Sequence, residues 1–225
     1  MNFSVPQKKV TMSTGGVKSP LLICCVAIIF FAGDALCADI AGRITSVSGD
    51  AVCRRPGVAV VRTLKSGDTV QVADLLETGN NGKIKVLLSA ETVVIVLPGS
   101  ALRFSQYSFD RDKKRMSAVA SLKQGTARFI LYKELKGGST LNIETDQSLI
   151  QASRADFVVA ASGQQTELFT LAGSVGVRNG SNLVVGNVRV RENQSVIVQA
   201  QTPPTSPSVI PLPVRRKFIK DGRQF

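Results

Sequence analysis

Apolar and polar residues alternate in short runs along most of the chain, from Ile40 to Gln201. The runs are rich in Val, Ile, Leu and Thr and are separated by Gly, Asn and Ser, as in Lys83–Leu88 and Thr92–Leu97. The clearest separator is Gly79-Asn80-Asn81-Gly82, since Asn and Gly accept positive φ angles at low cost. The pattern has no helical period. It predicts an all-β domain of short antiparallel strands, arranged as a sandwich or roll.

The main alternative is a fold of parallel strands joined by helices, which requires crossovers of about a dozen residues or more. The nearest such stretch is Asp110–Leu122, but its charged start is typical of a solvated hairpin tip. We therefore expect Leu102–Tyr107 and Met116–Leu122 to be strands that flank this tip. Thr126–Tyr132 is predicted as a further, separate strand.

The first 38 residues have the three parts of a secretory signal peptide. The first 20 residues carry three lysines and no acidic residue, Leu21–Ala32 is apolar throughout, and Gly33–Ala38 ends in small residues. A membrane-spanning helix needs about 20 apolar residues, and Asp34 ends this run earlier. The pattern predicts export to the periplasm or out of the cell by a signal over residues 1–38. An uncleaved membrane anchor is the alternative.

Cysteines are few once this signal is set aside. Cys24, Cys25 and Cys37 lie within it, and the residues before them do not fit a lipid-attachment site. Cys53 alone remains, so the domain has no internal disulfide. We expect Cys53 to be a small buried strand residue. A reactive thiol assisted by the arginines beside it is the alternative, although no histidine is present to activate it.

The composition argues against most hydrolases. The 225 residues include no His, which removes the commonest general base and the imidazole ligand of zinc sites. The formal net charge of +12 favours anionic partners. Nucleic acid is not among those we expect, because the signal exports the chain and it has two Tyr and no Trp for base stacking.

The composition changes again after Gln201. Five prolines punctuate residues 202–225, which end in a basic stretch containing Arg215-Arg216-Lys217 and Lys220. Proline removes backbone donors and favours extended, solvated chain. The sequence therefore predicts three segments: a signal at 1–38, a β domain at 39–201 and a disordered, Pro-rich basic tail at 202–225.

The order of several short motifs resembles the FecR-type periplasmic domain family. The motifs are strand-and-turn segments that follow one another in the family's order between about Ile40 and Ala200: Leu64–Val70, Asp74–Gly79, Gly82–Leu87, Glu91–Leu102, Leu122–Phe129, Leu141–Thr145, Ala155–Val159 and Leu171–Val177. The chain departs from the family pattern at Ser153-Arg154-Ala155, Thr145-Asp146 and Ala90-Glu91.

The resemblance implies an all-β domain of the bacterial envelope that binds other proteins or envelope polymers and is not an enzyme. In the iron-dicitrate sensors of this family, the domain follows a membrane helix and a cytoplasmic segment that controls a sigma factor. This chain has about 20 residues before its apolar run, fewer than the roughly 40 that a cytoplasmic domain needs to fold unaided. We therefore expect a stand-alone exported member of the family.

The candidate contacts are basic residues. Acidic residues are scattered without the spacing of a calcium loop, and Asp68 and Asp74 are predicted to form turns. Lys136-Gly137-Gly138-Ser139 is predicted as a hairpin loop and not as a phosphate-binding loop. Taken together, these residues lead us to expect no catalytic residue, cofactor or metal site. The proposed contacts with an anionic partner form two clusters, one at the hairpin tip and one in the tail: Arg111, Lys113, Lys114, Arg115, Arg215, Arg216, Lys217 and Lys220. A solubilising surface is the alternative interpretation.

Two functional hypotheses follow. The first is a non-enzymatic exported module that binds an envelope protein through a sheet edge or basic loops, as a scaffold or sensor. The second is an adhesin-like binder of peptidoglycan or lipid head groups, which acts through the basic loop and tail. Contact with the membrane would occur through an uncleaved signal or through charge.

Overall fold

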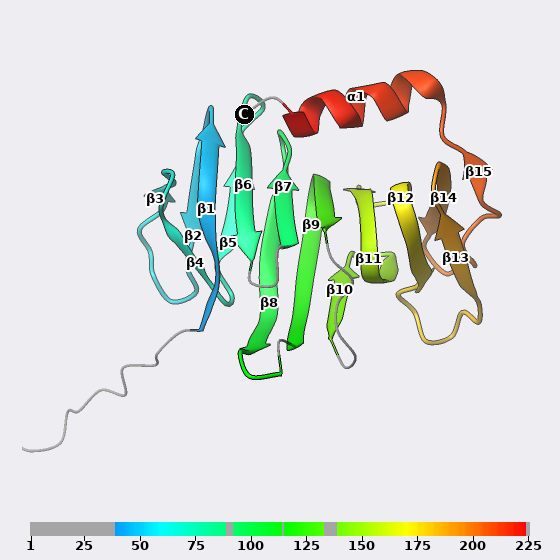
Figure 1. Ribbon diagram of the computed structural model, residues 1–225, viewed down its shortest axis with the longest axis horizontal. Helices are drawn as coiled ribbons and strands as arrows, with labels where there is room; N and C mark the ends of the chain where they lie inside the picture. Colours follow the sequence, from blue (N-terminus) through cyan, green and yellow to red (C-terminus); the bar gives the residue numbers. More distant parts are fainter. Residues whose placement is uncertain (1–38, 89–91, 114, 133–138, 224–225) are drawn as a thin grey trace, which may run out of the picture. The chain divides into compact units, whose positions relative to one another are not determined.

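Strands make up most of the chain from Ile40 onward, and they form one folded sheet with two layers (Figure 1). The computed structural model describes residues 39–88, 92–113, 115–132 and 139–223. Within these residues the sheet has 15 strands, and one helix follows them. The all-β prediction is confirmed. The predicted signal, residues 1–38, lies outside the described residues.

Layer 1 contains nine strands or parts of strands, and all of its pairings are antiparallel. In spatial order these are β4 (Thr69–Gln71), β1 (Ile40–Ser48), β6 (Lys83–Leu88), β7 (Thr92–Val96), β9 (Arg115–Leu131), β11 (Ser148–Ala161), β12 (Gln165–Asn179), β14 (Gln194–Gln199) and β15 (Ser208–Val209).

Layer 2 shares the three longest strands, β9, β11 and β12, with layer 1. Its order is β3 (Arg62–Thr63), β2 (Ala51–Arg54), β5 (Leu75–Thr78), β8 (Ala101–Asp110), β9, β10 (Thr140–Glu144), β11, β12 and β13 (Asn187–Arg191). The pairing of β9 with β10 is parallel. Strand β9 begins in layer 2 and ends in layer 1. The chain then returns to layer 2 as β10, which runs beside the start of β9 in the same direction.

The shared strands bend where they pass between layers. In β9 the bend is at Gly125, which has a φ of +84° and lies so close to Ser100 that a Cβ atom would be 2.4 Å from its Oγ. Before the bend β9 pairs with β8, and after it with β7. Met116–Leu122 and Thr126–Tyr132 are thus one continuous strand and not the two that the sequence predicted. The sequence pattern predicts a break at this glycine, whereas the glycine lets one strand bend from layer 2 into layer 1.

Alternation along the strands places the core between the layers. Leu141, Ile143 and Ile150 point inward from layer 2 and are almost completely buried. From layer 1, Phe129 and Phe157 stack with ring centroids 5.3 Å apart and an interplanar angle of 16°. Both layers contribute to one continuous hydrophobic cluster. The polar residues between these positions therefore lie on the outer faces, where binding sites can form.

Two hydroxyl side chains connect the family motifs inside the fold. Thr78 Oγ1 donates to the Leu97 carbonyl at 2.6 Å and accepts from the Ser100 N–H at 2.9 Å. Ser100 Oγ in turn donates to the Thr126 carbonyl at 3.0 Å and accepts from the Thr126 N–H at 2.8 Å. These bonds tie the end of β5 to the β7–β8 connection and to the bend in β9, so motifs that are separate in sequence form one corner of the domain.

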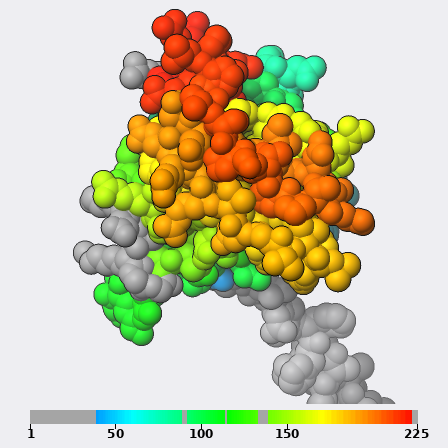
Figure 2. Space-filling model, turned by 90° about the vertical axis from the view of Figure 1, so that its right-hand side faces the viewer, coloured from blue at the N-terminus to red at the C-terminus, as the bar shows by residue number. Residues whose placement is uncertain are grey.

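The segment after Gln201 differs from the predicted disordered tail. Residues 202–211 run along β14 and include β15, and α1 (Leu212–Arg223) then crosses the strands of layer 1 (Figure 1). Figure 2 looks onto the end formed by β12–β15, where β15 and the start of α1 (orange to red) lie over the yellow-orange segments. Ile210 and Phe218 are buried against Val158 and Leu171. Hydrophobic packing therefore orders this segment despite its prolines.

The helix itself has recognisable sequence causes. Pro213 lies in the first turn, where a missing N–H is not needed. Val214 and Phe218 are four residues apart and so share one face, and that face packs on layer 1. Lys220 and Arg223 lie in the last turn, where the helix dipole favours positive charge. Among the described residues, no helix has the length and apolar character needed to span a membrane.

Candidate functional site: a polar groove on layer 2

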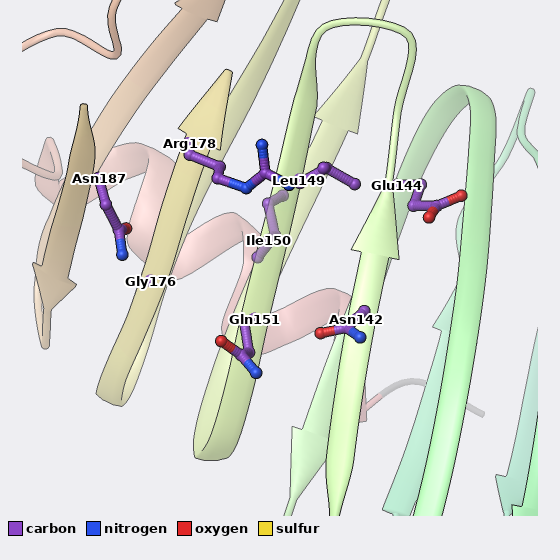
Figure 3. A pocket seen from close by; sticks show the side chains of 8 residues that line it. All are labelled: Asn142, Glu144, Leu149, Ile150, Gln151, Gly176, Arg178 and Asn187. Atoms are coloured by element: carbon purple, nitrogen blue, oxygen red, sulfur yellow. The ribbon is translucent and has the colours of Figure 1, made fainter. Parts of the chain in front are cut away.

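An open groove crosses the outer face of layer 2 over β10, β11, β12 and β13. It consists of two adjoining hollows of about 350 and 500 Å³, which share Gln151, Gly176 and Asn187 as lining residues. Figure 3 shows the smaller hollow, with side chains from four neighbouring strands converging on it. The four strands lie side by side in layer 2, so the groove runs across strands and not along one of them.

The strand register aligns the central lining residues. Asn142 pairs with Gln151, Gln151 with Gly176, and Gly176 with Arg189. Side chains alternate between the faces of a strand, so the residues next to these in sequence point into the core instead. The result is a row of two carboxamides, a gap and a guanidinium across the outer face.

The gap in this row is produced by Gly176. A Cβ atom at this position would have Asn187 Oδ1 at 3.6 Å and the Gln151 carbonyl oxygen at 3.8 Å. A small side chain would therefore fit, but it would make the groove shallower at its floor, the surface formed by Gly176. Glycine inside a strand weakens it and commonly marks a close approach by another molecule. Here it opens the floor between the carboxamides of Gln151 and Asn187 (Figure 3).

A second row runs parallel to the first. Glu144 pairs with Leu149, and Leu149 with Arg178, in the strand register. Figure 3 shows the Arg178 side chain reaching across β11 toward Leu149, with Glu144 on β10 at the far end. Arg178 also donates from Nη1 to Asn182 Oδ1 at 3.5 Å, which connects the groove to the β12–β13 loop. Opposite charges therefore lie at the two ends of this row.

The β12–β13 loop beside the groove exposes apolar side chains. Leu183 and Val185 are 94% and 89% exposed, the two highest values among the large hydrophobic residues of the described chain. Since Asn182 in the same loop contacts Arg178, these aliphatic groups lie next to the polar groove. An amide-rich surface bordered by exposed aliphatic groups has the mixed character of a protein-binding surface.

The chemistry available in the groove is hydrogen bonding and charge. Carboxamides and hydroxyls both donate and accept, and the guanidinium groups donate in pairs to carboxylates. Glu144 is the single carboxylate among the described residues that line the two hollows. The described residues also contain no cluster of three or more potential metal ligands. The arrangement is suited to recognition of a polar ligand.

The basic residues proposed from the sequence occupy two distant places. Arg111 and Lys113 lie in the β8–β9 turn and Arg115 starts β9, while α1 lies across the other side of the molecule (Figure 1). In the turn, the Lys113 N–H donates to Asp110 Oδ1 at 2.9 Å, and its ammonium lies 3.9 Å from Asp110 Oδ2. Lys114 is outside the described residues. The two clusters therefore do not form one site.

The tail cluster divides between two faces of α1. Arg216, Lys217 and Lys220 are exposed on the outer face, whereas Arg215 is half-buried toward layer 1. The sequence placed all four in one solvated cluster, because a disordered segment has no faces. The helix gives three of them a shared outward direction and the fourth a different environment.

An ion pair between an exposed arginine and a buried carboxylate lies apart from the groove, near Cys53. Arg55 donates to both carboxylate oxygens of the fully buried Asp74, at 2.9 and 3.2 Å, and the Gln71 N–H donates to Asp74 at 3.0 Å. Burial alone would raise the pKa of Asp74, but these hydrogen bonds and the charge of Arg55 hold its pKa below the usual value. This carboxylate stabilises a turn, as does Asp68, which accepts from the Lys65 N–H at 3.0 Å.

Cys53 is a free thiol and is buried, as the sequence predicted. Burial and then the negative charge of Asp74 raise the pKa of the thiol above its usual value. A raised pKa lowers the thiolate fraction and so argues against the reactive alternative.

Sequence reasoning did not identify the groove. Its residues come from four strands and have no shared motif, so only the register brings them together. Two local signals were present: Gly176 within a run of apolar and polar alternation, and arginines at alternate positions in Arg189-Val190-Arg191. Alternate positions on a strand share a face, and both arginines are exposed.

One protein-family model matches part of the chain. Residues 74–176 match the family model described as FecR protein. This range begins at the buried Asp74 and ends at Gly176 on the groove floor, so the β13 side of the groove lies beyond it. No curated protein sequence matches the chain.

Two solved structures are similar in part. Both are described as a candidate anti-sigma factor from Parabacteroides distasonis ATCC 8503, at 1.65 and 2.50 Å resolution. They are 18% and 17% identical to this chain, each with a TM-score of 0.48 over 60% of it. The match spans 59% of each of those chains, less than two thirds of their length. The match to the FecR family model confirms, over residues 74–176, the resemblance found in the motifs.

Proposed function

We propose that this chain is a non-enzymatic binding module of the bacterial envelope that recognises a protein partner through the groove on layer 2. The observation that carries the proposal is the group of three carboxamide side chains, Asn142, Gln151 and Asn187, that line the groove around Gly176. Carboxamide side chains can bond to both the N–H and the C=O of an extended polypeptide, whatever its sequence. The guanidinium of Arg178 adds a preference for a nearby carboxylate.

The exposed loop supports a protein over a small molecule. Leu183 and Val185 would contact apolar side chains of a partner that lies over the groove, and burial of such groups contributes most of the affinity in protein interfaces. The groove is shallow and open, whereas small-molecule sites are commonly concave and mostly apolar. Export by the N-terminal signal would bring the module to the periplasm or the cell surface, where we expect the partner.

The proposal can be tested with a substitution that fills the groove and leaves its charge unchanged. A photo-crosslinking residue at Gln151 should capture a specific envelope protein in cells, and Gly176→Val should abolish the capture because its side chain raises the floor. Gly163→Val is the matched control, since a Cβ atom at Gly163 has no heavy atom within 4 Å. Equal capture by the two variants would contradict the proposal. Fractionation of the same cells would test export, which requires the protein outside the cytoplasm.

A second candidate function rests on a different surface. Arg216, Lys217 and Lys220 share the outer face of α1, which suits an anionic envelope polymer such as peptidoglycan or lipid head groups. Each basic residue near an anionic membrane contributes about 1 kcal/mol, so three support weak, salt-sensitive binding. Co-sedimentation with vesicles or peptidoglycan should then fall at high salt and when the three residues are changed to Glu. The same changes at Arg111, Lys113, Lys114 and Arg115 would test the hairpin tip separately.

A further inference from the structure

A further hollow lies between α1 and layer 1, distinct from the two hollows of the groove on layer 2. Its volume is about 380 Å³. Ile130 and Leu171 line it from the sheet, Ile219 lines it from the helix, and Tyr132 is a further lining residue. These groups give the hollow an apolar wall contributed by both α1 and the sheet. It also contains three charged side chains, two arginines and one aspartate. The two arginines differ in their hydrogen-bond partners.

One of the two arginines in the hollow donates a hydrogen bond from each of its three guanidinium nitrogens. Arg128 donates to Asp156 through Nε at 2.8 Å and through Nη2 at 2.6 Å, and its Nη1 donates to the Phe218 carbonyl at 2.8 Å. The side chains of Arg128 and Asp156 are 12% and 22% exposed. The single carboxylate in the hollow is therefore already neutralised by Arg128.

The other arginine has no such partner. Arg215 Nε is buried and has no hydrogen-bond partner among the described residues. No carboxylate of the described chain forms an ion pair with Arg215. A buried donor without a partner costs about 1–3 kcal/mol, and more when the group is charged. Among the described residues, the hollow thus contains one positive charge in excess and a donor without a hydrogen-bond partner.

We propose that this hollow binds a carboxylate attached to an apolar chain. The carboxylate pairs with Arg215, since guanidinium groups bind carboxylates with two parallel hydrogen bonds. The apolar chain lies against Ile130, Leu171 and Ile219, which are the aliphatic lining. Two sources have this chemistry: a free fatty acid of medium length, and the C-terminal residue of a polypeptide with apolar side chains.

Such a ligand would touch both α1 and the sheet. Binding would therefore stabilise the docked helix, because a ligand that binds the closed arrangement and not the open one shifts the equilibrium toward it. The groove on layer 2 would be unaffected, so the two sites can be tested independently.

The first experiment measures binding of decanoate to the purified protein by isothermal titration calorimetry, below the concentration at which micelles form. Arg215→Gln should weaken binding by at least about tenfold, which corresponds to one lost charge-assisted bond. Arg216→Gln, on the outer face of the same helix, should bind as the unchanged protein does. Acetate should bind more weakly than decanoate, because it has no apolar chain.

The second experiment separates the sources. A short apolar peptide with a free C-terminal carboxylate is compared with the same peptide carrying a C-terminal amide. Preference for the free acid would assign a protein terminus, and binding of decanoate alone would assign a fatty acid. Hydrogen exchange of residues 212–223 should slow when either ligand binds. Failure of both ligands to bind, or equal binding by Arg215→Gln and Arg216→Gln, would overturn the proposal.

Discussion

Arg128 donates a hydrogen bond of 2.8 Å to the backbone carbonyl of Phe218, 90 positions later in the chain. The same guanidinium holds Asp156 on the neighbouring strand through two further bonds. Lys83 Nζ also reaches α1, donating to the Asp221 carbonyl at 3.2 Å. Two cations of layer 1 thus bind carbonyl groups in the C-terminal half of the helix, where its dipole is negative. The docking of α1 depends on charge as well as on apolar contact.

Changing Arg128→Gln should release α1 before it affects the rest of the domain. The substitution removes three charge-assisted hydrogen bonds at a site with little solvent exposure, so we expect a loss of about 1–3 kcal/mol in the free energy of unfolding. Hydrogen exchange should become faster for residues 212–223, while β9 and β11 remain protected. Lys217→Ala, on the exposed face, is the control and should leave exchange unchanged. Equal protection of α1 in the two variants would show that apolar packing alone holds the helix.

Residues 202–225 could not be predicted correctly from local sequence alone, because they include a helix. Pro213, Val214 and Phe218 were all visible, but the number of prolines and charges favoured disorder. A short amphipathic helix gains its stability from the surface that it covers, and that surface is made by Val158 and Leu171, far away in sequence. The strands of the body were predictable because alternation is local. The groove was not predictable, because it depends on the register of four strands.

Gly125→Ala should destabilise the domain strongly. Its φ of +84° is unfavourable for alanine, and the new Cβ atom would lie 2.4 Å from Ser100 Oγ and 2.5 Å from Ser100 Cα. Strain of this kind costs about 1–3 kcal/mol, and the contact with Ser100 adds to it. Chemical denaturation would measure the loss. Gly163→Ala should change stability by less than about 0.5 kcal/mol, since the space around it is open. Similar values for the two variants would contradict the role assigned to the bend.

The thiol of Cys53 should be unreactive in the folded protein. It is 3% exposed, and burial raises its pKa, so both access and thiolate content are low. Alkylation at pH 8, followed by mass spectrometry of the peptide that contains Cys53, should show slow labelling that becomes fast in denaturant. Following this one peptide keeps Cys24, Cys25 and Cys37 from obscuring the result. Rapid labelling without denaturant would instead favour a reactive thiol.

The pair formed by Arg55 and Asp74 should make stability depend on pH. The pKa of Asp74 is lowered in the folded protein, so the charged carboxylate stabilises the fold above the pKa of the unfolded chain, about 4. This contribution is lost as the pH falls through the lower, folded pKa. Asp74→Asn removes the titrating group and the charge. We expect it to reduce the free energy of unfolding by about 1–3 kcal/mol at pH 7, and by less at pH 3.

Urea denaturation of the unchanged protein and of Asp74→Asn at pH 7, 5 and 3 would check this dependence. The difference between them should be largest at pH 7 and should narrow below about pH 4, because protonation of Asp74 weakens its bonds to Arg55. Asp112→Asn, on the exposed β8–β9 turn, is the matched control and should differ from the unchanged protein by less than about 0.5 kcal/mol. If the loss caused by Asp74→Asn were the same at all three pH values, the carboxylate would act through shape and not through its charge.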